Sequence, residues 1–106
     1  MTDGVVVREP GSGPATWAMS SLFEHLVGAE DTEGLLGVSL VTQPPGVATP
    51  LHRHTREAEA FYVLDGQVSY RAGEQQHELG PGWFIYLPRG LPHAFRIRGA
   101  SPARFV

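Results

Sequence analysis

Glycine and proline divide this chain into short apolar segments. The 106 residues include 13 glycines and nine prolines, and these residues cluster between runs rich in β-branched and aromatic side chains. Short apolar runs that are separated by turn residues are typical of an all-β barrel or sandwich. The length allows one compact core, so we expect a single all-β domain.

Seven runs are predicted as strands because turn residues bound each of them. Asp65-Gly66 separates the second run from the third and predicts a hairpin, since both residues tolerate positive φ. Strand follows strand without a helical crossover, so neighbouring strands are expected to be antiparallel. The runs are Leu36–Gln43, Phe61–Leu64, Gln67–Arg71, Gln75–Leu79, Trp83–Leu87, His93–Arg98 and Ala103–Val106.

The amino-terminal part has weaker signals. Ser21 and Glu24 have the spacing of a capping box, which would open a helix through Val27, but the all-β pattern of the rest favours a strand here. Residues 1–15 contain Gly11-Ser12-Gly13-Pro14 and are expected to be a loose arm. Residues 16–106 are predicted to form the barrel.

Several function classes are excluded by composition. The chain has no cysteine, lysine or asparagine, so it offers no thiolate nucleophile, no sulfur-ligated zinc and no Schiff-base lysine. The net charge is −3 with no basic cluster, which argues against nucleic acid. Trp83–Leu87, the longest apolar stretch, falls far short of the roughly 20 residues of a membrane span. No secretory signal is recognisable, so we expect a cytoplasmic protein.

Imidazole and carboxylate side chains carry the chemistry that remains. His52 and His54 are expected at the start of a strand, where the two-residue period places both imidazoles on one face. Glu59 shares strand parity with apolar Phe61, and a carboxylate facing a core requires a partner. His93 likewise begins an apolar face. Three imidazoles and one carboxylate suit a divalent transition metal: iron, manganese, cobalt, nickel, copper or zinc.

Each of these residues also has a plainer interpretation. An isolated His-x-His pair is commonly solvated, a lone glutamate on a strand is commonly a surface carboxylate, and His93 could be a hydrogen-bonded structural residue. Glu57 competes with Glu59 as the ligand but lies where the chain is still turning, so Glu59 is favoured. His25 and His77 have no partner pattern and are interpreted as structural or solvated.

Two spaced motifs resemble the signatures of the cupin superfamily. The first runs Gly46-x5-His52-x-His54-x4-Glu59-x6-Gly66, within residues 46–66; the second runs Gly82-x5-Pro88-x-Gly90-x2-His93, within residues 82–97. The resemblance implies an antiparallel double-stranded β-helix, which is a jelly-roll barrel. It also implies that His52, His54, Glu59 and His93 bind one metal near the barrel centre.

Two departures from the family pattern stand out. Ile97 occupies a position where the family commonly has asparagine, so an apolar wall is expected there. Similar small cupins usually continue beyond the equivalent of Val106, so either a partner subunit covers that edge or the barrel is partly open. Because many cupins pair edge strands, we expect a homodimer.

The chain resembles small single-domain bacterial cupins grouped with quercetin 2,3-dioxygenase in four segments: Trp17–Met19, Leu22–Glu24, His52–Glu57 and Phe61–Leu64. This resemblance implies a dioxygenase-type enzyme in which the metal chelates a small enol, flavonol-like or aromatic substrate, and Glu59 acts as both ligand and catalytic base. Alternatives are a non-redox cyclase, isomerase or lyase, and a small-molecule-binding cupin without activity. Strand parity assigns the pocket to Phe61, Val63, Tyr86, Phe95 and Ile97.

Overall fold

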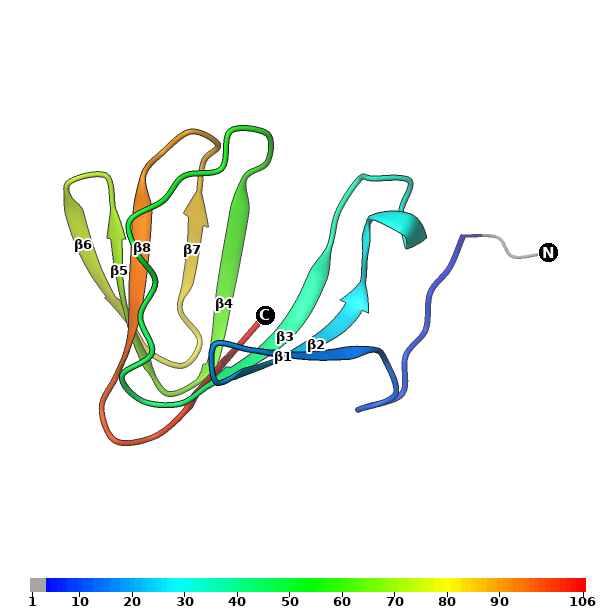
Figure 1. The fold of residues 1–106 in the computed structure, drawn as a ribbon, viewed down its shortest axis with the longest axis horizontal. Coiled ribbons are helices and arrows are strands. Elements are labelled where there is room, and N and C mark those ends of the chain that lie inside the picture. Colours follow the sequence, from blue (N-terminus) through cyan, green and yellow to red (C-terminus); the bar gives the residue numbers. More distant parts are fainter. Residues whose placement is uncertain (1–3) are drawn as a thin grey trace.

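The computed structural model describes residues 4–106, which form nine strands and one 3-10 turn, η1 (Ala29–Asp31) (Figure 1). Every pairing between strands is antiparallel. The strands are β1 (Ala15–Ala18), β2 (Ser21–Val27), β3 (Val38–Gln43), β4 (Glu59–Asp65), β5 (Gln67–Ala72), β6 (Gln75–Leu79), β7 (Phe84–Leu87), β8 (His93–Arg98) and β9 (Ala103–Phe105).

The strands form two sheets of unequal size. The larger sheet has the order β1-β2-β3-β9-β4-β7 and the smaller has the order β6-β5-β8. Because the smaller sheet has half as many strands, it faces only part of the larger one. Figure 1 shows β4 to β8 together at one end of the molecule, with β1, β2 and β3 extending away from them. The predicted all-β jelly-roll fold is confirmed.

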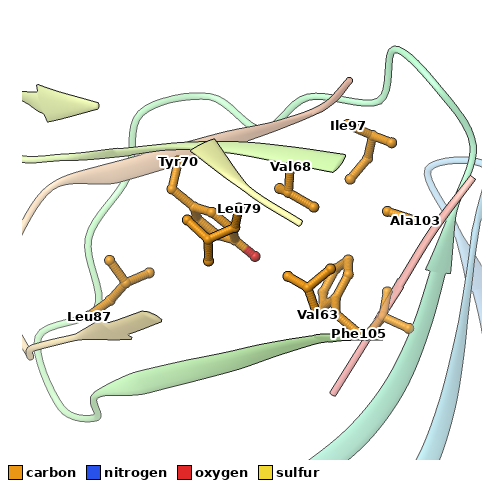
Figure 2. Close-up of a cluster of buried hydrophobic side chains, with 9 residues drawn as sticks. Val63, Val68, Tyr70, Leu79, Leu87, Ile97, Ala103 and Phe105 are labelled. Atoms are coloured by element: carbon orange, nitrogen blue, oxygen red, sulfur yellow. The ribbon is translucent and has the colours of Figure 1, made fainter. Parts of the chain in front are cut away.

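The hydrophobic core lies between the two sheets. Figure 2 shows Val63 and Phe105 of the larger sheet across from Val68 and Tyr70 of the smaller one. Val63, Val68 and Tyr70 are fully buried, so burial across this layer supplies the main favourable contribution to folding. The full cluster is Val41, Val63, Val68, Tyr70, Leu79, Leu87, Ile97, Ala103 and Phe105.

The predicted hairpin at Asp65-Gly66 is wrong, although a turn does occur there. The preceding strand, β4, pairs with β7 and β9, whereas β5 pairs with β6 and β8. Gly66 has a φ of +86°, and a β-carbon at this position would lie 2.7 Å from the Pro102 carbonyl oxygen. The turn therefore packs against residues 102–103 and carries the chain from one sheet to the other. This crossing lets Val63 and Val68 enter the core from opposite sides.

The amino-terminal strands form a wing, defined here as β1, β2 and β3. Ser21–Val27 is a strand, as predicted. It pairs with β1, which the sequence did not predict, through a tight turn where Met19 and Ser20 have φ values of 50° and 61°. The radius of gyration is 14.5 Å, larger than the roughly 13 Å typical of a compact domain of this length. The wing therefore makes the molecule elongated.

The segment before the wing contains no strand in residues 4–14. Arg8 anchors it, because its Nε donates a hydrogen bond to the Leu26 carbonyl oxygen and its guanidinium lies 3.7 Å from the Asp31 carboxylate. The boundary predicted between an arm of residues 1–15 and the barrel stays a prediction, and residues 1–3 lie outside the described part. No helix formed by the described residues is long and apolar enough to cross a membrane.

Gly66 and Gly82 offer a matched test of the crossing turn. Both have a φ of +86°, but a β-carbon at Gly82 would meet nothing within 4 Å, whereas one at Gly66 would clash with backbone atoms. We expect both alanine variants to lose about 1–2 kcal/mol from backbone strain, and Gly66→Ala to lose about 1–3 kcal/mol more from overpacking. Urea unfolding measures the difference. Equal losses would show that the turn does not need the close approach.

Candidate metal centre

Four side chains meet at one end of the barrel, where the two sheets come together. His52 forms an isolated antiparallel bridge with His93, the first residue of β8. Its amide donates to the His93 carbonyl oxygen at 2.9 Å, and the His93 amide donates back at 2.7 Å. Glu59 begins β4 in the other sheet. Residues 53–58 cross between the sheets and bring His54 to the same place.

The expectation that His52 and His54 lie at the start of a strand is wrong. Residues 53–58 form a loop, and of the two histidines only His52 pairs with a strand, through an isolated bridge. The physical reason is that His52 pairs with β8 while Glu59 pairs with β7, so the chain has to leave one sheet before it joins the other. Gly90, in the loop before β8, donates its amide to the His54 carbonyl oxygen at 2.7 Å and holds the crossing in place.

The three imidazoles are nonetheless close together. Their ring centroids are separated by 4.4 Å between His52 and His93, 5.3 Å between His52 and His54, and 5.5 Å between His54 and His93. One nitrogen of each ring lies within 4.8 Å of the others, so the cluster could hold a metal ion.

An oxygen atom of the chain lies beside Nδ1 of each ring, and for His52 and His93 it accepts a hydrogen bond. Nδ1 of His52 lies 2.7 Å from the Pro50 carbonyl oxygen, and Nδ1 of His93 lies 3.1 Å from the Leu91 carbonyl oxygen. In both cases Nδ1–H is the donor, which leaves Nε2 with a free lone pair. Nδ1 of His54 lies 3.2 Å from a carboxylate oxygen of Glu57. Partners of this kind fix the tautomer and orientation of metal-binding histidines in proteins.

Glu59 faces the same centre from the other sheet. Its Oε1 lies 2.9 Å from His54 Nε2, and its Oε2 lies 3.3 Å from His93 Nε2. The second contact does not have hydrogen-bond geometry, so His93 Nε2 is buried without a hydrogen-bond partner among the described residues. Glu57, the competing carboxylate, is 64% exposed and contacts only the outer nitrogen of His54. The arrangement favours Glu59 over Glu57.

The donor set therefore fits a divalent transition metal. His93 is 2% exposed, and a buried imidazole nitrogen without a partner is costly unless another group satisfies it. Three neutral imidazole nitrogens and one carboxylate oxygen form a set that binds several divalent ions of this series.

The remaining histidines lie outside this cluster. The His25 ring lies between Thr16 and Ser39, at 2.9 and 3.3 Å, and helps to hold the wing strands together. His77 is exposed on β6. Both positions agree with a structural or solvated interpretation.

The proposed pocket residues divide into three groups. Phe61 and Phe95 are half-buried and follow Glu59 and His93 by two residues, so they lie beside the cluster with ring centroids 6.2 Å apart. Val63 and Ile97 are fully buried and fill the core. The placement of Tyr86 inside the barrel is wrong, because this residue is 60% exposed.

The direction of Tyr86 follows from the alternation along β7. Ile85 and Leu87 face the core, which leaves Phe84 and Tyr86 on the outer side. Together with Trp83, these two residues line an external groove of about 520 Å³ beside β6.

A family model described as the cupin domain matches residues 39–106. The chain belongs to the cupin family. This cupin is 29% identical over 99 residues to quercetin 2,3-dioxygenase of Bacillus subtilis (strain 168), a match that covers 92% of this chain and 29% of that protein. It is 36% identical over 62 residues to dimethylsulfoniopropionate lyase DddQ of Ruegeria pomeroyi, a match that covers 58% of this chain and 30% of that protein. The chain thus spans less than a third of these curated relatives.

Among solved structures, this cupin is similar to a predicted oxalate decarboxylase from Thermotoga maritima. The TM-score is 0.79 and the sequence identity 20%, and the match covers 95% of this chain and 93% of the other. At this identity the likeness shows the fold.

Sequence reasoning missed two features of the centre of this cupin. The first is the pair of backbone carbonyls that orient His52 and His93, each two residues before its histidine, at Pro50 and Leu91. A proline within two residues before each of these histidines was a usable signal, because it marks a rigid corner. The second is Tyr70, a fully buried residue of β5 whose hydroxyl has no hydrogen-bond partner in the described part of the chain.

Tyr70 connects the core to the centre. Its ring lies 5.6 Å from that of Phe61 and 5.5 Å from that of Phe95, between centroids. Burial, and to a lesser extent the negative charge of Glu59, raises the pKa of Tyr70. The phenol therefore stays protonated in the fold at pH values where an unfolded tyrosine, with a pKa of about 10, ionises.

The raised pKa of Tyr70 predicts a loss of stability in alkali. Above pH 10 the unfolded chain releases a proton that the folded chain retains, so the contribution is complete below pH 10 and falls as the pH rises. The slope approaches about 1.4 kcal/mol per pH unit. Tyr70→Phe should remove this part of the slope, and Tyr86→Phe, at an exposed position, should retain it. Urea unfolding between pH 9 and pH 11 tests this; identical slopes in wild type and Tyr70→Phe would contradict it.

Proposed function

We propose that His52, His54, Glu59 and His93 bind one divalent transition metal and that this cupin is a metal-dependent dioxygenase-type enzyme. The observation that carries the proposal is the arrangement of the three imidazoles, with Nδ1 of His52 and His93 hydrogen-bonded to backbone carbonyls and Nε2 of His54 and His93 facing Glu59. The similarity to a protein named quercetin 2,3-dioxygenase supports the reaction class. The substrate class is a small enol, flavonol-like or aromatic compound.

The bound metal would supply a Lewis acid and, for a redox-active ion, an electron donor and acceptor. Within the chain, Glu59 is placed to accept the proton of a substrate hydroxyl, because its carboxylate is half-buried and points at the centre. The hydrogen bonds at Nδ1 keep His52 and His93 in the orientation that presents Nε2. Phe61 and Phe95 follow Glu59 and His93 by two residues, so their half-buried rings would form the apolar, core-facing side of the centre.

A non-redox reaction is the second candidate. The similarity to a protein named as a lyase favours it, because the same imidazole and carboxylate set can polarise a carbonyl and move a proton without oxygen. Oxygen uptake separates the two: a dioxygenase consumes oxygen with a flavonol or related enol, whereas a lyase, isomerase or cyclase turns over anaerobically. A third candidate is a binding module, for which the metal-loaded protein would bind a small molecule and convert none.

Metal content tests the centre itself. We expect about one transition metal ion per chain in the purified protein. His93→Ala and Glu59→Gln should each lower metal affinity by at least tenfold, because both remove a converging donor. His77→Ala and Glu33→Gln are the matched controls and should lose far less, since both residues are exposed and neither lies in or beside the centre. Elemental analysis after dialysis measures the outcome. A folded wild-type protein that retains no metal would refute the site.

We also propose that the wing pairs two copies of the chain. Its outer part exposes large apolar side chains, including Trp17 (73% exposed) and Met19 (71% exposed), and exposed apolar groups gathered in one region mark interaction surfaces. Sedimentation equilibrium should give twice the chain mass of 11.5 kDa. Trp17→Ser should weaken the dimer. Trp83→Ser tests the external groove beside β6, and loss of the dimer in this variant instead would contradict the proposal. A monomeric wild type would contradict the proposal. The cytoplasmic location and the absence of nucleic-acid partners stay predictions.

A further inference from the structure

Three arginines lie in the two loops that carry the candidate metal centre. Arg53 and Arg56 belong to the crossing between His52 and Glu59, and Arg89 belongs to the loop before His93. The two loops are tied together by the hydrogen bond from the Gly90 amide to the His54 carbonyl oxygen. Figure 1 shows both loops at the same end of the barrel, between β7 and β8 and before β4.

These arginines have no partners within the described part of the chain. All three are exposed, and none forms a hydrogen bond or ion pair with another described residue. By contrast, Arg8 contacts Asp31 and Arg104 contacts Asp65. The loop arginines are therefore free to bind a group from outside the chain.

The charge of this end differs from that of the rest of the molecule. The whole chain has a net charge of −3. The two loops and the centre nevertheless contribute three guanidinium groups against the carboxylates of Glu57 and Glu59, and a divalent ion would add two further positive charges. A local positive field in an otherwise acidic protein attracts anions and raises their local concentration.

The centre between these loops is the place where the proposed metal ion would add its charge. His93 is 2% exposed, and its Nε2 faces the cluster without a hydrogen-bond partner among the described residues. Glu59 is the acceptor that lies against this nitrogen, and its geometry leaves the nitrogen unsatisfied. A metal ion that satisfies this nitrogen would place two positive charges at the centre, at the same end of the barrel as the loop arginines, which are unpaired within the described residues.

We propose that the ligand of this centre is a small organic anion, a carboxylate or an enolate, and that Arg53, Arg56 and Arg89 select it over neutral analogues. The inference rests on the proposed metal centre and specifies its substrate class. The arginines act by attracting and orienting the anion, while the reacting oxygen binds at the histidine cluster. Guanidinium groups suit this role because they bind carboxylates in a bidentate geometry.

The experiment uses the full chain loaded with cobalt(II), whose visible spectrum reports changes in coordination. Cobalt content is measured first by elemental analysis. The protein is then titrated with acetate and, as the neutral analogue, acetamide, at low and high ionic strength. We compare wild type with two charge-matched double variants, Arg53→Gln with Arg89→Gln and Arg96→Gln with Arg98→Gln. Arg96 and Arg98 are exposed on β8 beyond the centre, so they control for net charge.

We expect acetate, and not acetamide, to change the spectrum of the wild-type protein. The double variant in the loops should bind acetate about fivefold more weakly at low ionic strength, because two guanidinium charges that attract the anion through water are lost. This difference should shrink at high salt. The double variant on β8 should bind acetate as the wild type does.

The alternative outcomes are distinguishable. Equal affinities in the two double variants would overturn the role of the arginines. A cobalt-loaded wild type whose spectrum acetate leaves unchanged would overturn the anion class and leave the metal centre intact. A wild type that binds no cobalt would overturn the proposed function together with this inference.

Discussion

The two-way backbone bridge between His52 and His93 is the constraint on which the rest of this centre depends. It joins a segment outside the strands to the first residue of β8. Its two backbone hydrogen bonds hold the main chain of both histidines side by side. The hydrogen bonds from Nδ1 to the Pro50 and Leu91 carbonyls then set the ring directions. Glu59 arrives from the other sheet, which means that the centre forms only when the two sheets close. The four proposed metal-binding side chains are therefore brought together only as the barrel closes.

Much of the barrel could be predicted from the sequence because turn residues bound its strands. The segments at Gln67–Arg71, Gln75–Leu79 and His93–Arg98 agree with β5, β6 and β8 to within one residue. The spacing of the two motifs also identified the four residues of the centre. This spacing is a property of the sequence, so it can be recognised even where a residue such as His54 lies in a loop. What the spacing could not show was that residues 53–58 leave the strand conformation to cross between sheets.

The two errors about hairpins have a common physical cause, which is that local turn chemistry does not determine which strands pair. Asp65-Gly66 has the strongest hairpin signal in the chain, yet its flanking strands lie in different sheets, and Val63 and Val68 on these strands are fully buried across the core from each other. Met19-Ser20 has no such signal and makes the β1–β2 hairpin. Tyr86 was misplaced for a different reason: a four-residue strand of apolar residues carries no polar marker to show which side faces out.

The separation between the wing and the centre determines which properties of this protein a substitution can alter independently. Its exposed apolar residues belong to β1 and its turn, whereas every residue of the centre belongs to β4, β8 or the loops beside them. Because the two regions share few side chains, substitutions that alter how copies assemble need not disturb the ligands, and substitutions near the ligands need not alter assembly. A lineage carrying this fold can therefore acquire a new quaternary structure and a new substrate by separate sets of mutations.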